Sequence, residues 1–192
     1  LFISGIGIVV GLGIGTYTGM LLSVLQFRPL WHTWLLPVLF TLSAIDTGLA
    51  LIIFYVSTYE KEVGVDKMHH RLEIAVVTLI PLELLTLAGL LWVAIEGPAD
   101  AVKSANLIVK GLLSPYFWIF VVAIGLVVPL SICVSRLSGL MKYNAATLSM
   151  VGSFSCLLGG FALRALILLA GLPNSIASPG IQQLLSGISY IP

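Results

Sequence analysis

Three ionisable residues lie deep inside long apolar segments of this sequence. Asp46 stands in TLSAIDTG, Glu83 in LIPLELLTL and Arg164 in LLGGFALR. An ionisable group near the centre of a membrane costs about 2.5–3.5 kcal/mol on insertion scales, so such groups usually face a protein interior or a water path. A buried carboxyl group without a cationic partner can also carry a proton. The three residues therefore predict a polar site that relays protons.

Tyr17, Thr18 and Gly19 form a second unusual group, which places two hydroxyls and a bare backbone inside an apolar run. The depths of the polar groups can be counted from one membrane face at about 1.5 Å of helix rise per residue. They are about 15, 18, 21 and 11 Å for Tyr17, Asp46, Glu83 and Arg164, respectively. These compatible depths on four segments predict one shared polar site.

A structural interpretation of the ionisable residues stays open beside the functional one. Asp46 and Arg164 could form a buried ion pair that only fixes helix packing. Glu83 could belong to a buried hydrogen-bond network of the same kind. Both interpretations explain why the residues are in the membrane, but only the relay requires that they exchange protons.

The segments that must hold these residues are five candidate transmembrane helices. Of 192 residues, 59% are hydrophobic and only 9% are charged, whereas soluble domains carry about 25% charged residues. The composition predicts an integral membrane protein, and a net charge of +1 without a basic run gives no indication of a nucleic-acid partner. A spanning helix needs about 20 apolar residues. Such runs cover residues 1–27, 34–57, 72–95, 116–136 and 145–172.

Glycine and proline residues inside these runs predict where the helices approach or bend. Gly48, Gly159 and Gly160 lack side chains and would allow close helix packing. Pro81 and Pro129 free backbone carbonyls near mid-membrane and permit kinks.

The chain divides into a five-helix transmembrane domain, residues 1–172, and a C-terminal interfacial tail, residues 173–192. IQQLLSGI in the tail predicts a short interfacial helix, and ADAVKSANLIVKGLL predicts another helix that lies flat on the membrane. RPLWHTW predicts an interfacial belt, with the entrance to a ligand pocket or a docking surface for a partner as alternatives. The face that carries Arg136, which we call the Arg136 face, has five basic residues against three on the other, which favours a cytoplasmic location for it.

The cysteines and histidines do not predict a metal site. Cys133 and Cys156 are 23 residues apart in apolar runs and are interpreted as small buried hydrophobes. Zinc sites and iron–sulfur clusters need about four ligands, usually with short spacings. His32, His69 and His70 lie in or beside loops, whereas a membrane haem needs axial ligands from the bundle interior. We therefore expect no metal, haem or iron–sulfur cluster in this chain.

Four segments in combination resemble the NrfD/PsrC family of membrane subunits from polysulfide-reductase-type respiratory complexes. They are YTGMLLS, RPLWHTWLLPVLFTLSAIDTGLAL, LELLTLAGL and LLGGFALRALILLAG. The resemblance spans about residues 8–172 and implies an all-α bundle in a prokaryotic cytoplasmic (inner) membrane. Family members have eight or more spanning helices, so the five predicted here would be the last five. Another chain could then supply the three N-terminal helices.

The resemblance also implies a reaction and partners. Family members exchange electrons between menaquinol or another quinone and an iron–sulfur subunit, which serves a catalytic molybdopterin or multihaem cytochrome c subunit. Tyr17 resembles a tyrosine that hydrogen-bonds the quinone head group, and Arg164 matches the arginine of the last helix in GGF-x-LR. Asp46 stands where relatives have a small hydroxyl residue, so we expect its role to be specific to a subgroup.

We therefore predict a quinone-reactive membrane subunit of a respiratory oxidoreductase complex. The predicted quinone pocket is Tyr17, Thr18 and Gly19, and the predicted proton relay is Glu83, Asp46 and Arg164. Two hypotheses from other classes stay open: an ion or proton-coupled transporter that uses the same ionisable residues, and a purely structural membrane anchor. No inverted repeat is visible, which disfavours the transporter. Whether the subunit is itself catalytic also stays open.

Overall fold

The computed structural model describes residues 2–25, 30–58, 65–138 and 145–171, and all regular structure in these ranges is helical. The elements are α1 (Phe2–Ser23), α2 (Leu35–Thr58), α3 (Val65–Glu96), α4 (Ala99–Val109), α5 (Ser114–Tyr116), the π-helical η1 (Phe117–Val127), α6 (Val128–Leu137) and α7 (Ala145–Gly171). The predicted C-terminal tail and its interfacial helix lie outside the described residues.

Within the described residues, five stretches are long and apolar enough to cross a membrane, which confirms the all-α, five-helix prediction. They are Gly5–Ser23, Leu35–Thr58, His70–Glu96, Ser114–Leu137 and Thr147–Gly171. The fourth combines α5, η1 and α6 into one continuous rod. The largest boundary error is at α3, which begins at Val65 rather than at Leu72. Its first two turns are polar but contain no glycine or proline, so they extend the helix beyond the apolar run.

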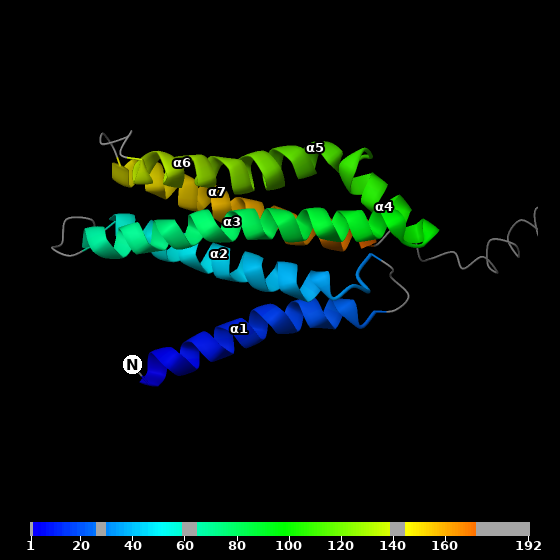
Figure 1. The fold of residues 1–192 in the computed structure, drawn as a ribbon, viewed down its shortest axis with the longest axis horizontal. Helices are drawn as coiled ribbons and strands as arrows, with labels where there is room; N and C mark the ends of the chain where they lie inside the picture. The colour runs from blue at the N-terminus through cyan, green and yellow to red at the C-terminus, as the bar shows by residue number, and fades with distance from the viewer. Residues whose placement is uncertain (1, 26–29, 59–64, 139–144, 172–192) are drawn as a thin grey trace, which may run out of the picture.

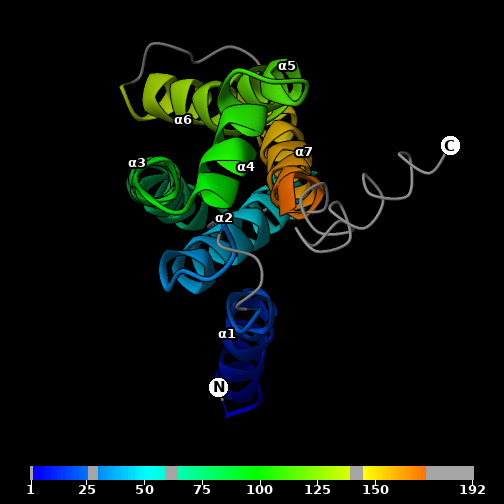
Figure 2. The ribbon, with the colours of Figure 1, turned by 90° about the vertical axis from the view of Figure 1, so that its right-hand side faces the viewer.

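The helices form a bundle with one outlying member. α2, α3, the α5–η1–α6 rod and α7 lie side by side, and α1 lies at the edge of this group, next to α2 (Figures 1 and 2). α2 is central to the assembly because α1, α3 and α7 all pack against it, while α7 also packs against η1 and α6. Only 6% of the α1 span is buried, against 50% of the α7 span. The interior of the bundle is therefore built without α1.

The interior faces follow the spacing expected for packed helices. Buried residues recur three and four positions apart, a pattern typical of helices that cross at shallow angles. On α3 they are Glu73, Val76, Ile80, Glu83, Leu87, Leu90 and Ala94. On α7 they include Ser149, Ser153, Cys156, Gly160, Leu163, Ile167 and Ala170. The same register that buries the apolar residues therefore also turns both α3 carboxylates toward the interior.

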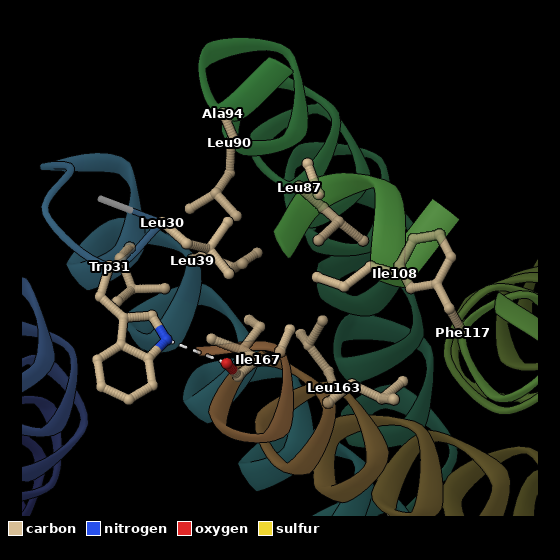
Figure 3. Packing of buried hydrophobic residues seen from close by; sticks show 14 of the residues in the cluster. Leu30, Trp31, Leu39, Leu87, Leu90, Ala94, Ile108, Phe117, Leu163 and Ile167 are labelled. Carbon is tan, nitrogen blue, oxygen red and sulfur yellow. Dashed lines mark hydrogen bonds between the residues drawn. The ribbon is translucent and has the colours of Figure 1, made fainter. Parts of the chain in front are cut away.

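A large apolar cluster fills the half of the bundle that lies opposite the Arg136 face. We call it the apolar cap; Figure 3 labels ten of its members. They are Leu30, Trp31, Leu39, Leu87, Leu90, Ala94, Ile108, Phe117, Leu163 and Ile167. α4 also contributes Ala101 and Ala105, so the helix predicted to lie flat on the membrane has one face inside the core.

Trp31 joins the first connection to the last helix. Its indole Nε1 donates a hydrogen bond to the Ile167 carbonyl at 3.0 Å, drawn as a dashed line in Figure 3. The indole ring lies where a side chain on Gly171 would stand. Trp31 is 6% exposed, so its assignment to an interfacial belt is wrong, whereas Trp34 is 76% exposed. The absence of a side chain at Gly171 makes room for the indole ring, and a carbonyl near the helix end accepts the hydrogen bond from the indole N–H.

Trp31→Phe is expected to lower the free energy of unfolding by about 1–3 kcal/mol. The change removes a buried hydrogen bond, worth about 1 kcal/mol, and leaves a void beside Gly171. Reversible unfolding in mixed detergent micelles, followed by circular dichroism, would measure it. Trp34→Phe is the matched control, and an equal loss in both variants would contradict the role of Trp31.

Candidate functional site

The structure brings together the three ionisable residues found at mid-membrane. Asp46 on α2 and Glu83 on α3 are 2% and 3% exposed, and Arg164 on α7 is half-buried. Glu83 interacts electrostatically with both Asp46 and Arg164. Three helices thus contribute to one polar cluster. The use of these residues as a proton relay stays a prediction.

A cysteine on α7 forms a hydrogen bond with Asp46 on α2. The Cys156 thiol donates a hydrogen bond to Asp46 Oδ2, with 2.9 Å between sulfur and oxygen. Asp46 Oδ1 has no hydrogen-bond partner among the described residues, and a buried oxygen in that state is costly. Sequence reasoning treated Cys156 only as a small hydrophobe and missed this contact. A depth count would have indicated it, because Cys156 stands about 22 Å from the face used for Asp46.

A small cavity separates these polar groups. Its volume is about 10 Å³, which is close to the minimum for one water molecule. We call it the inner cavity; its polar lining is Ser43, Asp46, Thr47, Glu83 and Cys156, and its other lining residues are apolar or glycine. A water molecule here would have several polar partners, including the free oxygen of Asp46.

Consecutive glycines bring α7 close to two neighbours at the level of the inner cavity. A Cβ on Gly159 would collide with the backbone of Gly125 in η1, and a Cβ on Gly160 would collide with Thr47 in α2. The predicted close packing is therefore confirmed for both. Gly48, predicted to act in the same way, has open space where its Cβ would be, because it faces an open groove between α1 and α2.

The predicted quinone-pocket residues lie away from the inner cavity. Tyr17 is 64% exposed, and the Thr18 hydroxyl donates to the Ile14 carbonyl at 3.0 Å. Gly19 is buried where a side chain would collide with Pro37. No α1 residue lines the inner cavity, so the expected single site is wrong for Tyr17: equal depth does not make α1 a neighbour of the carboxylates. Quinone binding by these residues stays a prediction.

An apolar groove of about 430 Å³ lies between α1 and α2. Its α1 wall contains three glycines, and its α2 wall is mostly aliphatic. The lining residues are Gly7, Ile8, Gly11, Leu12, Gly15, Thr41, Ala44, Ile45, Gly48, Leu49 and Ile52. The Thr16 and Thr41 hydroxyls are hydrogen-bonded at 3.1 Å. The size and lining suit a lipid-like chain.

A second polar cluster lies near the Arg136 face. Arg136 Nε on α6 is 2.8 Å from Glu73 Oε1 on α3, and Arg136 Nη1 donates to the Ser149 hydroxyl on α7. Beside it lies a cavity of about 20 Å³, the outer cavity, whose lining includes Glu73, Ser149 and Ser153 with both cysteines. Sequence reasoning missed this cluster, although Glu73, Arg136 and Ser149 all stand near span ends at one face.

Comparison with known proteins places the fold in a family. A family model described as "Polysulphide reductase, NrfD" matches residues 2–174. The chain belongs to the NrfD family. This confirms the resemblance seen in the four sequence segments. With five apolar spanning helices, this NrfD-family chain is a multi-pass protein of a bacterial inner membrane, as predicted.

Curated relatives within the NrfD family share about a third of their aligned residues with the chain. The C chain of polysulfide reductase from Wolinella succinogenes is 32% identical over 169 residues, which cover 85% of this chain and 51% of that protein. Protein NrfD of Escherichia coli is 32% identical over 163 residues, and a protein NrfD homolog of Haemophilus influenzae is 31% identical over 162 residues. Each of these two alignments covers 82% of this chain and 49% of the relative. The chain thus spans about half the length of these relatives. No solved structure gives a significant match.

Proposed function

We propose that this chain is the quinone-reactive membrane subunit of a respiratory oxidoreductase complex. It exchanges electrons and protons between menaquinol or another quinone and an iron–sulfur partner subunit. That partner passes electrons to a catalytic subunit of the molybdopterin or multihaem cytochrome c type. Support comes from membership of the NrfD family and from a relative that is named as one chain of polysulfide reductase.

One observation carries the proposal: two buried carboxylates from different helices line a water-sized cavity in the middle of the bundle. A purely structural anchor has no need of a buried carboxylate oxygen without a partner. A buried carboxylate is suited to accept a proton, and quinone chemistry requires proton acceptors within the membrane. The family membership favours this use over an ion transporter.

The first helix offers the features that a quinone needs. The exposed Tyr17 phenol can donate a hydrogen bond to a head-group oxygen, and the apolar α1–α2 groove has room for a hydrocarbon tail. Thr18 and Gly19 follow Tyr17 in α1, and none of the three is among the lining residues of the groove. The proposal therefore assigns the head group to Tyr17 and only the tail to the groove.

The proposed chemistry is divided between the ligand and the chain. A bound quinol supplies two electrons and two protons on oxidation. Tyr17 orients the head group, Asp46 and Glu83 accept protons, and Arg164 stabilises the carboxylate charge of Glu83. The electrons leave for the iron–sulfur partner.

Purification of the intact complex through a tag on this subunit tests the proposal. We expect an iron–sulfur subunit to copurify and to be reduced by added menaquinol analogue. Tyr17→Phe should lower kcat/KM for quinol about tenfold, because one hydrogen bond of about 1.4 kcal/mol is lost. Tyr116→Phe is the matched control, since Tyr116 is also exposed and stacks on Phe120 through its ring.

Two outcomes would contradict different parts of the proposal. A complex without an iron–sulfur subunit and without quinol oxidation would overturn the function. Normal quinol oxidation in Tyr17→Phe would overturn only the assignment of the head-group donor.

A further inference from the structure

The inner and outer cavities meet at one residue. Cys156 lines both of them, with the Asp46 side chain on one side and the Glu73 cluster on the other. Each cavity has the volume of about one water molecule. The thiol is therefore the boundary between two sites that can each hold a water.

The polar residues of α7 lead from the membrane face to this boundary. Ser149, Ser153 and Cys156 are spaced four and three residues apart, which places them on one face of the helix. All three line the outer cavity. Ser149 to Cys156 is about 10 Å along the helix. Because the Glu73–Arg136 pair lies at the outer end, polar groups extend without a wide gap from the Arg136 face to Asp46.

In the opposite direction the described interior is mostly apolar. Its residues form the apolar cap, in which Leu36, Leu39, Leu90 and Ile167 are among the least exposed residues of the described chain. Thr86 is a buried polar residue on this side, and its hydroxyl donates a hydrogen bond to the Leu82 carbonyl of its own helix. The two cavities and the polar groups beside them therefore lead from Asp46 toward the Arg136 face.

The geometry points to a one-sided proton path, a half-channel that runs from Glu73 through the outer cavity, Cys156 and the inner cavity to Asp46. The inference rests on the proposed function, because it supplies the exit for the protons released by quinol oxidation. The groups that face the path are Arg136 and Glu73 at the outer end, Cys133 beside the outer cavity, and Glu83 beside the inner cavity, where Arg164 acts electrostatically on Glu83.

Proton transfer along this path can be written step by step. A proton on Asp46 Oδ2 passes to the Cys156 sulfur while the thiol gives its own proton to water in the outer cavity. That water then passes a proton to the Glu73 carboxylate, from which it leaves at the Arg136 face. Cys156, the water and Glu73 end in their starting protonation states, Asp46 has become a carboxylate that can accept the next proton, and one proton has moved from Asp46 to the surface. The same steps in reverse deliver a proton to Asp46.

Hydrogen–deuterium exchange at Cys156 tests the path without quinone. The intact complex in lipid nanodiscs is transferred into D₂O, and the S–H stretching band is followed by infrared spectroscopy. The difference between the wild type and Cys156→Ala isolates the band of this thiol. Ser153→Leu fills the outer cavity, and Val151→Leu, on the exposed side of the same helix, is the matched control that leaves the cavity unchanged. We expect Ser153→Leu to slow exchange at least tenfold and Val151→Leu to leave it within twofold.

Quinol-dependent turnover of the same variants gives a second measurement. We expect Ser153→Leu to lower turnover by a factor similar to its effect on exchange. Unchanged exchange in Ser153→Leu would overturn the path, and slowed exchange with normal turnover would overturn its use in the reaction. Absence of quinol turnover in the wild type would overturn the proposed function. The water path would still be supported in that case if Ser153→Leu slowed exchange and the control variant did not.

Discussion

Asp46→Asn is expected to lower quinol-dependent turnover of the intact complex by about a hundredfold. Positioned acid–base groups contribute about 10²–10⁴ to rates, and the amide keeps the size of the carboxyl group but cannot carry its proton. Initial rates of electron transfer from a quinol analogue, normalised to the amount of complex, would measure the loss. Thr78→Val is the control, because Thr78 lies on the exposed side of α3 with its hydroxyl bonded to the Ala75 carbonyl.

Stability measurements on the same variant separate the relay from a structural role. If Asp46 only fixes helix packing, Asp46→Asn should destabilise the fold and leave the rate of the remaining folded protein within twofold of wild type. If Asp46 relays protons, the variant should instead keep its stability and lose turnover. The variant removes a buried carboxylate of which one oxygen has no partner among the described residues, so the free energy of unfolding should stay equal or rise, while turnover falls.

Gly159→Leu is expected to destabilise the bundle by about 3 kcal/mol or more. Overpacking of a core usually costs about 1–3 kcal/mol, and here the new side chain meets the backbone of Gly125 rather than a flexible side chain. The helices η1 and α7 would have to separate at the level of the inner cavity. Gly159→Ala should show the same effect at a smaller size, and unfolding in mixed detergent micelles would measure both.

Gly48 provides the matched control for this prediction. It is also a glycine inside a spanning helix, but no described atom lies within 4 Å of the place for its Cβ. Gly48→Ala should stabilise α2 slightly, by up to about 1 kcal/mol, because alanine favours the helix. Equal stabilities for Gly159→Leu and Gly48→Leu would refute the close contact between α7 and η1.

The spans and the convergence of the three ionisable residues followed from the sequence. Apolar runs of about 20 residues identify membrane helices on length alone. Helix rise then converts residue number into depth, which placed Asp46, Glu83 and Arg164 at compatible levels. Depth is a single coordinate, and for these residues it was sufficient because they lie on helices that pack against one another.

Other parts of the site depend on which helices are neighbours and on how each is rotated. Tyr17 has a suitable depth, but α1 packs outside the bundle. Glu73 and Arg136 pair across α3 and α6, and the Cys156 thiol reaches Asp46 only because two glycines bring α7 against α2 and η1. Trp31 looks interfacial by its position after a span, yet it fills the space left by Gly171. These details depend on how the helices pack against one another. The residue pattern of a single helix does not determine that packing.

The apolar cap has an electrical consequence. Because it closes one side of the interior, a proton that reaches Asp46 from the Arg136 face crosses only part of the membrane field, about 12 Å of a core about 30 Å thick. A full crossing is worth about 2.3 kcal/mol per charge at 100 mV, so this partial crossing is worth about 1 kcal/mol. The bundle would thus sense the membrane potential, and the voltage across the membrane would set how readily Asp46 exchanges its proton.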